Sequence, residues 1–145
     1  DVNLTAAFSC SQVVVPFMIK NKNGSIINFT SINAEICAGT GNPAYIASKG
    51  GLKMLGKAFA KDYGKYGIRV NNIGPGFVRT QMTAKSYADP QKRKARTDRT
   101  ILGRWAEPHD MVGPCIFLAS DASKYMTAQD IYVDGGWLAN GLHEY

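Results

Sequence analysis

A tyrosine and a lysine stand four positions apart in the stretch AYIASKGGLKMLGKAF, residues 44–59. If this stretch is helical, Tyr45 and Lys49 share one face, because four residues make just over one turn. A nearby ammonium group lowers the pKa of a phenol, which is about 10 in free tyrosine. Such a tyrosine can give or take a proton while a carbonyl group is reduced. Taken alone, however, the spacing is more often that of an ordinary pair on a helix surface.

Two further features lie where parallel strands are expected to end. Ser31 ends the β-branched stretch SIINFTS at 25–31, where its hydroxyl could hydrogen-bond a substrate oxygen as charge builds on it. The stretch IRVNNIGPG at 68–76 ends in Pro75 and Gly76, which turn the chain and let a flat ligand approach the backbone. Active groups of parallel sheets gather at such carboxyl ends. The plainer alternatives are a capping serine and a simple Pro-Gly turn.

The segments that must position these residues alternate between helix and strand. Helices are expected at residues 4–20, 43–63 and 107–121. Strands are expected at 25–31, 68–76 and 129–136, and the polar segment 77–104 is expected to be irregular. This order predicts an α/β fold with a doubly wound parallel sheet and helices on both faces. Three strands make a small sheet, so the chain looks like one part of a larger domain.

The charge of the chain is concentrated in one segment. The net charge is +6, and residues 85–104 carry seven basic and two acidic side chains. A basic run can bind nucleic acid, but no nucleic-acid motif and no regular interleaving of aromatic residues accompanies this one. A solvated helix, or a loop near an anionic substrate or cofactor, is the favoured interpretation, and no nucleic-acid partner is expected.

The composition disfavours several other classes of protein. No run of about 20 apolar residues is present, so we expect no membrane span and no membrane partner. Cys10, Cys37 and Cys115 are odd in number and widely spaced, which favours reduced thiols in a cytoplasmic protein. With two histidines in the chain, no metal site is expected. Asp1 follows no signal-peptide pattern, and we interpret it as a cut rather than a native start.

Taken together, these residues resemble the short-chain dehydrogenase/reductase family. The motifs follow the family's order and approximate spacing: Asn3 in DVNL, Ser31 in NFTS, Tyr45 and Lys49 in YIASK, NNIGPGFVRT at 71–80 and IYVDGG at 131–136. The resemblance covers nearly all of residues 1–145 and implies a single, incomplete Rossmann-like domain, the C-terminal part without the N-terminal nucleotide-binding half. The lone GTG at 39–41 is interpreted as a loop rather than as the family's phosphate-binding loop.

The resemblance implies a role for each matching residue. Tyr45 would be the general acid in reduction and the base in oxidation. Lys49 would lower the pKa of Tyr45 and hydrogen-bond the nicotinamide ribose. Ser31 would orient and stabilise the substrate oxygen. Asn3 would hold a water molecule that links Lys49 to solvent.

The loop after the second strand would carry the other cofactor contacts. The family places the nicotinamide against this loop, so the candidates here are Pro75, Gly76, Val78 and Thr80. The cofactor would be NAD or NADP, and the residue that normally selects between them follows a strand that this sequence does not contain.

The resemblance also suggests a class of substrate. Residues 81–104 occupy the place of the family's variable substrate lid, and their basic side chains could attract a sugar acid. The stretches GRWAEPHD at 103–110 and VDGGWLA at 133–139 are similar to members that act on sugars and sugar acids. We therefore expect an NAD(P)-dependent oxidoreductase that interconverts a secondary alcohol and a ketone, with the isolated chain inactive. A 3-oxoacyl-carrier-protein reductase and a catalytically silent relative remain alternatives.

Members of this family usually form homo-oligomers, which implies a dimer or tetramer here. The interface would involve the helix that begins near residue 4 and the helix that carries Tyr45. Small residues would let these helices meet a partner closely: Gly50, Gly51, Gly56 and Ala60.

Overall fold

Three parallel strands form the centre of the protein. The computed structural model describes residues 2–38 and 42–140, so the predicted loop at 39–41 lies outside the described residues. The strands are β1 (Gly24–Phe29), β2 (Ile68–Pro75) and β3 (Asp130–Val133), and they pair in the order β1-β2-β3. Both pairings are parallel, which confirms the predicted α/β class.

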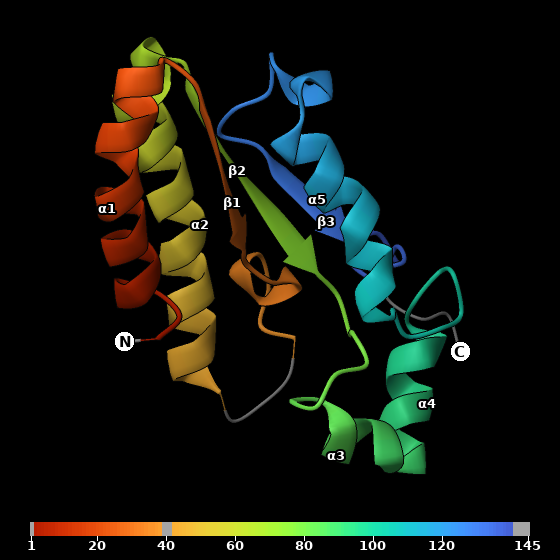
Figure 1. The fold of residues 1–145 in the computed structure, drawn as a ribbon. Helices are drawn as coiled ribbons and strands as arrows, with labels where there is room; N and C mark the ends of the chain where they lie inside the picture. The colour runs from red at the N-terminus through yellow and green to blue at the C-terminus, as the bar shows by residue number, and fades with distance from the viewer. Residues whose placement is uncertain (1, 39–41, 141–145) are drawn as a thin grey trace.

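Helices cover both faces of this sheet. Helices α1 (Thr5–Asn21) and α2 (Pro43–Tyr63) lie side by side on one face, and α5 (Val112–Ala119) lies on the other (Figure 1). The range of α2 agrees with the prediction of a helix at 43–63, where Pro43 takes an early helical position. The helix predicted at 107–121 is split, because a capping box around Glu107 first closes a short 3₁₀ turn, Pro108–Met111.

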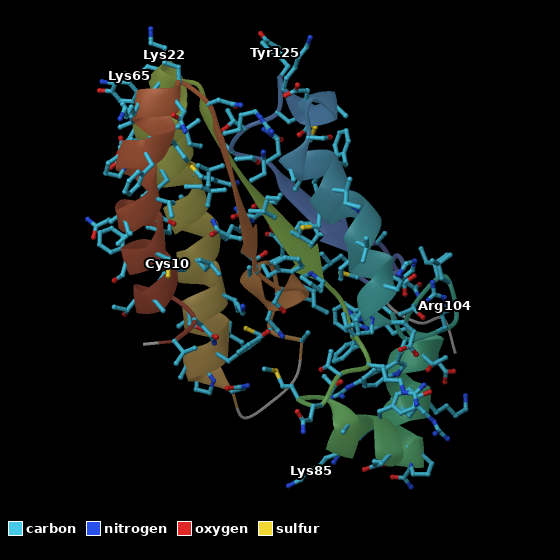
Figure 2. The ribbon with its side chains drawn as sticks, viewed as in Figure 1. Cys10, Lys22, Lys65, Lys85, Arg104 and Tyr125 are labelled. Atoms are coloured by element: carbon cyan, nitrogen blue, oxygen red, sulfur yellow. The ribbon has the colours of Figure 1, made fainter. Side chains whose placement is uncertain are left out.

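The prediction of an irregular segment at 77–104 is wrong over much of its length. The structure has α3 (Ala84–Ala88) and α4 (Pro90–Asp98) there, beyond the carboxyl ends of the strands (Figure 1). The Asp89 side chain caps α4 by accepting hydrogen bonds from two backbone N–H groups. Lys85 and Arg104 mark this end of the molecule, away from Lys22 and Lys65 (Figure 2).

Two apolar clusters hold the helices on the sheet. On the face of α1 and α2, buried residues from both helices and from β2 meet: Val15, Phe59, Ala60, Ile68 and Val70. On the face of α5, Ile73, Met111 and Leu118 form the second cluster. Burial of this apolar surface provides the main stabilisation of the layers.

A polar layer lies between α2 and the sheet. The Asn72 side chain is fully buried; its nitrogen donates to Asp130 Oδ1 at 2.7 Å, and its oxygen accepts from Asn28 Nδ2 at 3.1 Å. Lys57 Nζ lies 2.7 Å from Asp130 Oδ2. Burial acts to raise the pKa of Asp130, but the bonds from Lys57 and Asn72 and the charges of Lys57 and Lys53 outweigh it, so this pKa lies below its ordinary value.

Two of the small residues expected at a subunit interface face the sheet instead. A Cβ atom at Gly56 would overlap the Asn72 side-chain oxygen and lie 2.8 Å from Asn28 Nδ2. Ala60 belongs to the buried cluster under α1 and α2. Gly51 faces Leu4, since its Cβ would lie 3.0 Å from Leu4 Cδ2, whereas a Cβ at Gly50 would meet nothing within 4 Å. The assignment of Gly56 and Ala60 to a helix contact between subunits is therefore wrong.

We predict opposite effects for alanine at two glycines of α2. Gly56→Ala should lower the free energy of unfolding by about 1–3 kcal/mol, because the new methyl group pushes the buried asparagines apart. Gly50→Ala is the matched control and should raise it by up to about 1 kcal/mol, since alanine favours helix and the space is open. Chemical unfolding curves of the full-length protein that carries this chain measure both. Equal changes at the two positions would contradict this packing.

Candidate functional site

A cavity lies at the carboxyl ends of β1 and β2. Its volume is about 700 Å³, within the usual range for small-molecule sites. Ser31 follows β1, Tyr45 is in the first turn of α2, and Gly76 follows β2, and all three line the cavity. Residues from α3, α4 and the turn before them form the opposite wall: Met82, Thr83, Ser86, Lys92 and Arg96.

Ser31 is held in place by the turn that it begins. Its side chain is buried, and its Oγ accepts a hydrogen bond from the backbone N–H of Asn33 at 3.1 Å. The hydroxyl proton has no acceptor among residues 2–38 and 42–140, and it can be donated to a ligand oxygen. The serine is therefore both a cap, as the plainer interpretation had it, and a free donor in the cavity wall.

Lys49 lies one turn along α2 from Tyr45. Its Nζ is 5.7 Å from the centre of the Tyr45 ring and donates to the Phe29 carbonyl oxygen at 2.7 Å. Burial lowers the pKa of Lys49, so its charge is poorly hydrated. An ammonium group has several N–H donors, and those not used by Phe29 are free to bind the hydroxyl groups of a ribose. This donor set fits the nicotinamide ribose of the expected cofactor.

Asn3 is joined to the same helix, but through a neighbour of Lys49. Its Nδ2 donates to Ser48 Oγ at 3.2 Å, and Ser48 Oγ donates to the Tyr45 carbonyl oxygen at 2.7 Å. The contact ties the chain before α1 to the first turns of α2. The water-mediated link from Asn3 to Lys49 stays a prediction.

The four residues predicted to contact the cofactor after β2 have different surroundings. Gly76 lines the cavity, and its N–H donates to the Val133 carbonyl oxygen at 3.1 Å. Pro75 is the last residue of β2, and Val78 packs against the cluster under α5. Thr80 is exposed, and its N–H donates to Thr83 Oγ1 at 2.9 Å. Among these four, only Gly76 is brought into the wall shared by Ser31 and Tyr45.

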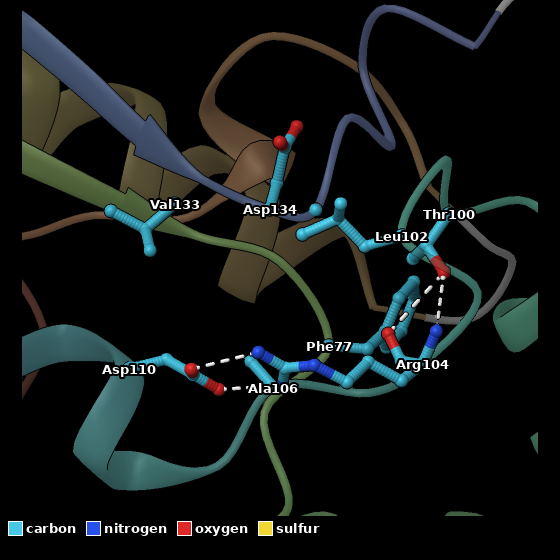
Figure 3. Close-up of a pocket in the computed structure, with 9 residues that line it drawn as sticks. Phe77, Thr100, Leu102, Arg104, Ala106, Asp110, Val133 and Asp134 are labelled. Atoms are coloured by element: carbon cyan, nitrogen blue, oxygen red, sulfur yellow. Dashed lines mark hydrogen bonds and ion pairs between the residues drawn. The ribbon is translucent and has the colours of Figure 1, made fainter.

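A second, smaller cavity lies beyond β3, where an ion pair joins two segments of the chain. Its volume is about 140 Å³, and none of the predicted catalytic residues lines it (Figure 3). Arg104 crosses it and forms two bonds to the Asp110 carboxylate, at 2.8 and 2.9 Å. These bonds from Arg104 hold the pKa of Asp110 well below its ordinary value. Arg104 and Asp110 are thus paired with each other, and the third charged residue of the lining, Asp134, accepts hydrogen bonds from the backbone N–H groups of Gly136 and Leu138.

Other kinds of site are not found in the part of the chain that the structure describes. Within residues 2–38 and 42–140, no group of three or more His, Cys, Asp or Glu side chains could hold a metal ion. None of the helices in these residues has the length and apolar character needed to cross a membrane. The three cysteines are free, and Cys10, on α1 (Figure 2), lines the groove between α1 and β1.

Comparison with known proteins identifies the family. A family model described as enoyl-(acyl carrier protein) reductase matches residues 1–138. The chain belongs to the short-chain dehydrogenase/reductase family. Within this family, a 3-oxoacyl-[acyl-carrier-protein] reductase of Thermotoga maritima is 43% identical over 137 residues, which are 94% of this chain and 54% of the relative. A 2-dehydro-3-deoxy-D-gluconate 5-dehydrogenase of Formosa agariphila is 40% identical over 140 residues, 96% of this chain and 53% of the relative.

Solved structures of the family have the same fold. A gluconate 5-dehydrogenase from Burkholderia cenocepacia, in complex with NADP and tartrate, superposes with a TM-score of 0.92 at 36% identity. The match covers 95% of this chain and 54% of that structure. The chain spans about half the length of the curated relatives that it matches.

The sequence did not show which side chains of residues 81–104 face the cavity. The segment 81–104 was expected to cover the substrate, and α3 and α4 do form one wall of the cavity. The individual residues that face the cavity could not be selected, because the segment was not assigned to helices. The pair Asp89-Pro90, a good cap followed by a good first helical residue, was the signal that could have placed α4.

Proposed function

We propose that this chain is the C-terminal, catalytic part of an NAD(P)-dependent oxidoreductase that interconverts a secondary alcohol and a ketone of a sugar, polyol or sugar acid. The observation that carries the proposal is that Ser31 and Tyr45 line one cavity, with Lys49 one turn behind the tyrosine. Hydroxyl, phenol and ammonium groups in this order match the needs of carbonyl reduction.

Each side chain has a distinct task in this reaction. The bound nicotinamide cofactor supplies or accepts the hydride. Ser31 donates a hydrogen bond to the substrate oxygen and holds it in the cavity. Tyr45 gives its proton to that oxygen in reduction and takes one in oxidation. Lys49 places its positive charge 5.7 Å from the centre of the Tyr45 ring and binds the ribose through its remaining donors. Asn3 is proposed to order the water that returns the proton to solvent.

The choice of a sugar-type substrate rests on the relatives and on the lid. The Burkholderia cenocepacia structure contains NADP and the dicarboxylate tartrate, and the Formosa agariphila relative is named for a sugar acid. The cavity wall of the present chain contains the hydroxyl groups of Thr83 and Ser86 and two cations. The same cavity is also lined by apolar side chains, among them Ile32, Ile46 and Met82, which would suit an acyl chain. A 3-oxoacyl-carrier-protein reductase is the second candidate, favoured by the Thermotoga maritima relative.

We predict that Tyr45→Phe lowers kcat by a hundredfold or more, because the proton donor is lost. Cofactor affinity should change little, since the ring and Lys49 remain. Tyr66→Phe is the matched control: this tyrosine is exposed beyond the end of α2 and should leave kcat unchanged. Steady-state kinetics of the full-length protein measure both. Turnover of Tyr45→Phe near that of the wild type would show that the proton comes from another group.

The free edge of β1 supports the proposal that this chain is part of a larger domain. β1 pairs with β2 alone among the described strands, and a groove of about 390 Å³ runs between it and α1. Residues Ser25–Phe29 of the strand line this groove. An unpaired strand edge with apolar neighbours suits a further strand. The adenosine and pyrophosphate contacts are proposed to lie in that further part.

We therefore predict that residues 1–145 alone bind NADH or NADPH at least tenfold more weakly than the full-length protein that carries them. The nicotinamide ribose contacts remain, but the contacts to the rest of the cofactor are absent. Calorimetric titration measures both affinities, and circular dichroism confirms that the isolated chain is folded. Equal affinity of a folded isolated chain would contradict the proposed division.

The outer surface of α1 and α2 supports a proposal of homo-oligomerisation. An apolar groove lies between the two helices, and Leu4, Phe8, Gly51 and Met54 line it. Met54 is 61% exposed, which is high for a large apolar side chain in a helix. We propose that a second copy of the protein covers this groove. Gly51, one of the small residues expected at the interface, lies in it.

We predict that Met54→Lys lowers the mass of the oligomer that the full-length protein forms in solution, because a charge in an apolar contact between copies is unfavourable. Tyr125→Lys is the control, since Tyr125 is fully exposed at the far end of the molecule (Figure 2). Light scattering coupled to size-exclusion chromatography measures the mass. A wild-type monomer, or a Met54→Lys protein of wild-type mass, would rule this interface out.

A further inference from the structure

Arg96 is a cation held in the wall of the candidate site by aromatic rings. Its guanidinium carbon lies 4.4 Å from the centre of the Phe77 ring and 5.5 Å from that of the Trp105 ring. One of its nitrogens donates to Ser86 Oγ. Arg96 lines the same cavity as Ser31 and Tyr45. These contacts hold the guanidinium in the cavity wall, and its N–H groups other than the one bonded to Ser86 are donors for another acceptor.

Three cations near Arg96 have a carboxylate partner within the protein. The pairs are Lys92–Asp89, Lys94–Asp98 and Arg104–Asp110, with nitrogen–oxygen distances of 3.3, 2.6 and 2.8 Å. Among the described residues, no carboxylate forms an ion pair with Arg96. Arg96 is thus a cavity-lining cation without an ion pair among the described residues, although the charge of Asp89 acts on it from a longer distance and favours its charged form.

The surroundings of Arg96 strengthen its interaction with an anion. The side chain is half-buried, and burial lowers its pKa from a very high ordinary value. The guanidinium stays charged at neutral pH but is poorly hydrated. A charge-assisted, two-pronged hydrogen bond to a carboxylate is therefore stronger here than at an exposed position.

We propose that Arg96 binds the carboxylate of the substrate and so makes sugar acids, rather than neutral sugars or polyols, the preferred substrates. This inference rests on the proposed function. In that function the reacting carbon of the substrate faces Tyr45, and the inference assigns Arg96 to the carboxylate at the other end of the substrate. The planar guanidinium matches a carboxylate in shape and in charge. Lys92 also lines the cavity, but its pairing with Asp89 makes it the weaker partner for the anion.

The test compares a charged and a neutral probe of nearly the same shape, D-gluconate and D-gluconamide. For Arg96→Gln in the full-length protein, kcat/KM for D-gluconate should fall at least tenfold, mainly through a higher KM. For D-gluconamide it should change by less than about threefold, because no charge pair is lost. Arg96→Lys keeps the charge but not the planar fork, and should recover part of the activity towards D-gluconate.

Lys94→Gln is the matched control. It removes the same charge from the same helix, but Lys94 is exposed, pairs with Asp98 and does not line this cavity. Both probes should react with Lys94→Gln as with the wild type. If kcat/KM of Arg96→Gln falls equally for both probes, or if this variant behaves like Lys94→Gln, the inference is overturned and the proposed function stays intact.

A second measurement separates this inference from the proposed function. If the wild type oxidises neither probe, the proposed function fails for this substrate class, and calorimetric titration with D-gluconate decides the binding site on its own. Binding to the wild type and to Lys94→Gln, together with at least tenfold weaker binding to Arg96→Gln, would support the assignment of Arg96. Absence of binding to the wild type, or equal binding to Arg96→Gln, would overturn it.

Discussion

The parallel pairing of β1 with β2 determines where every residue of the candidate site lies. Phe29 stands opposite Ile73 in the register, and Thr30 extends the pairing because its N–H and its hydroxyl both donate to the Ile73 carbonyl oxygen, at 2.7 and 3.0 Å. Ser31 and Gly76 therefore leave the sheet at the same edge. A shift of one residue would turn the side chains of β1 to the opposite faces, so the cavity depends on this register.

The rotation of α2 about its own axis is the second constraint. Tyr45, Lys49, Lys53 and Lys57 recur at intervals of four and so share one face of the helix. Each lysine has a partner on the side of α2 that faces the sheet. Lys49 donates a hydrogen bond to the Phe29 carbonyl oxygen, Lys53 forms an ion pair with Glu35, and Lys57 forms one with Asp130. Close contact at Gly56 keeps the helix near enough for these bonds. The contacts that orient the tyrosine thus extend far from the cavity.

The sequence predicted most where local chemistry decides the structure. The proline and glycine signals around residues 43–63 and the β-branched strands were enough to predict α2 and a parallel sheet, and they placed Ser31, Tyr45 and Gly76 at one edge of it. Contacts between segments that are distant in the chain could not be predicted from the sequence. Gly56 was assigned to a subunit contact because its partners, Asn28 and Asn72, lie on strands far away in sequence. Residues 84–98 lack a buried apolar stripe, so their helices were missed.

Helices α3 and α4 are held in place by a kind of packing that hydrophobic patterns do not reveal. α4 contains no buried residue, and its arginines lie on aromatic rings instead: Arg93 on Tyr87, and Arg96 on Phe77 and Trp105. Such cation–π contacts stabilise a polar helix while leaving its charge unneutralised. Arg96 is therefore held by the rings of Phe77 and Trp105 and by Ser86, and it also lines the cavity. If Arg96 binds an anionic substrate as proposed, attachment of α4 to the protein and recognition of that substrate would depend on the same guanidinium group.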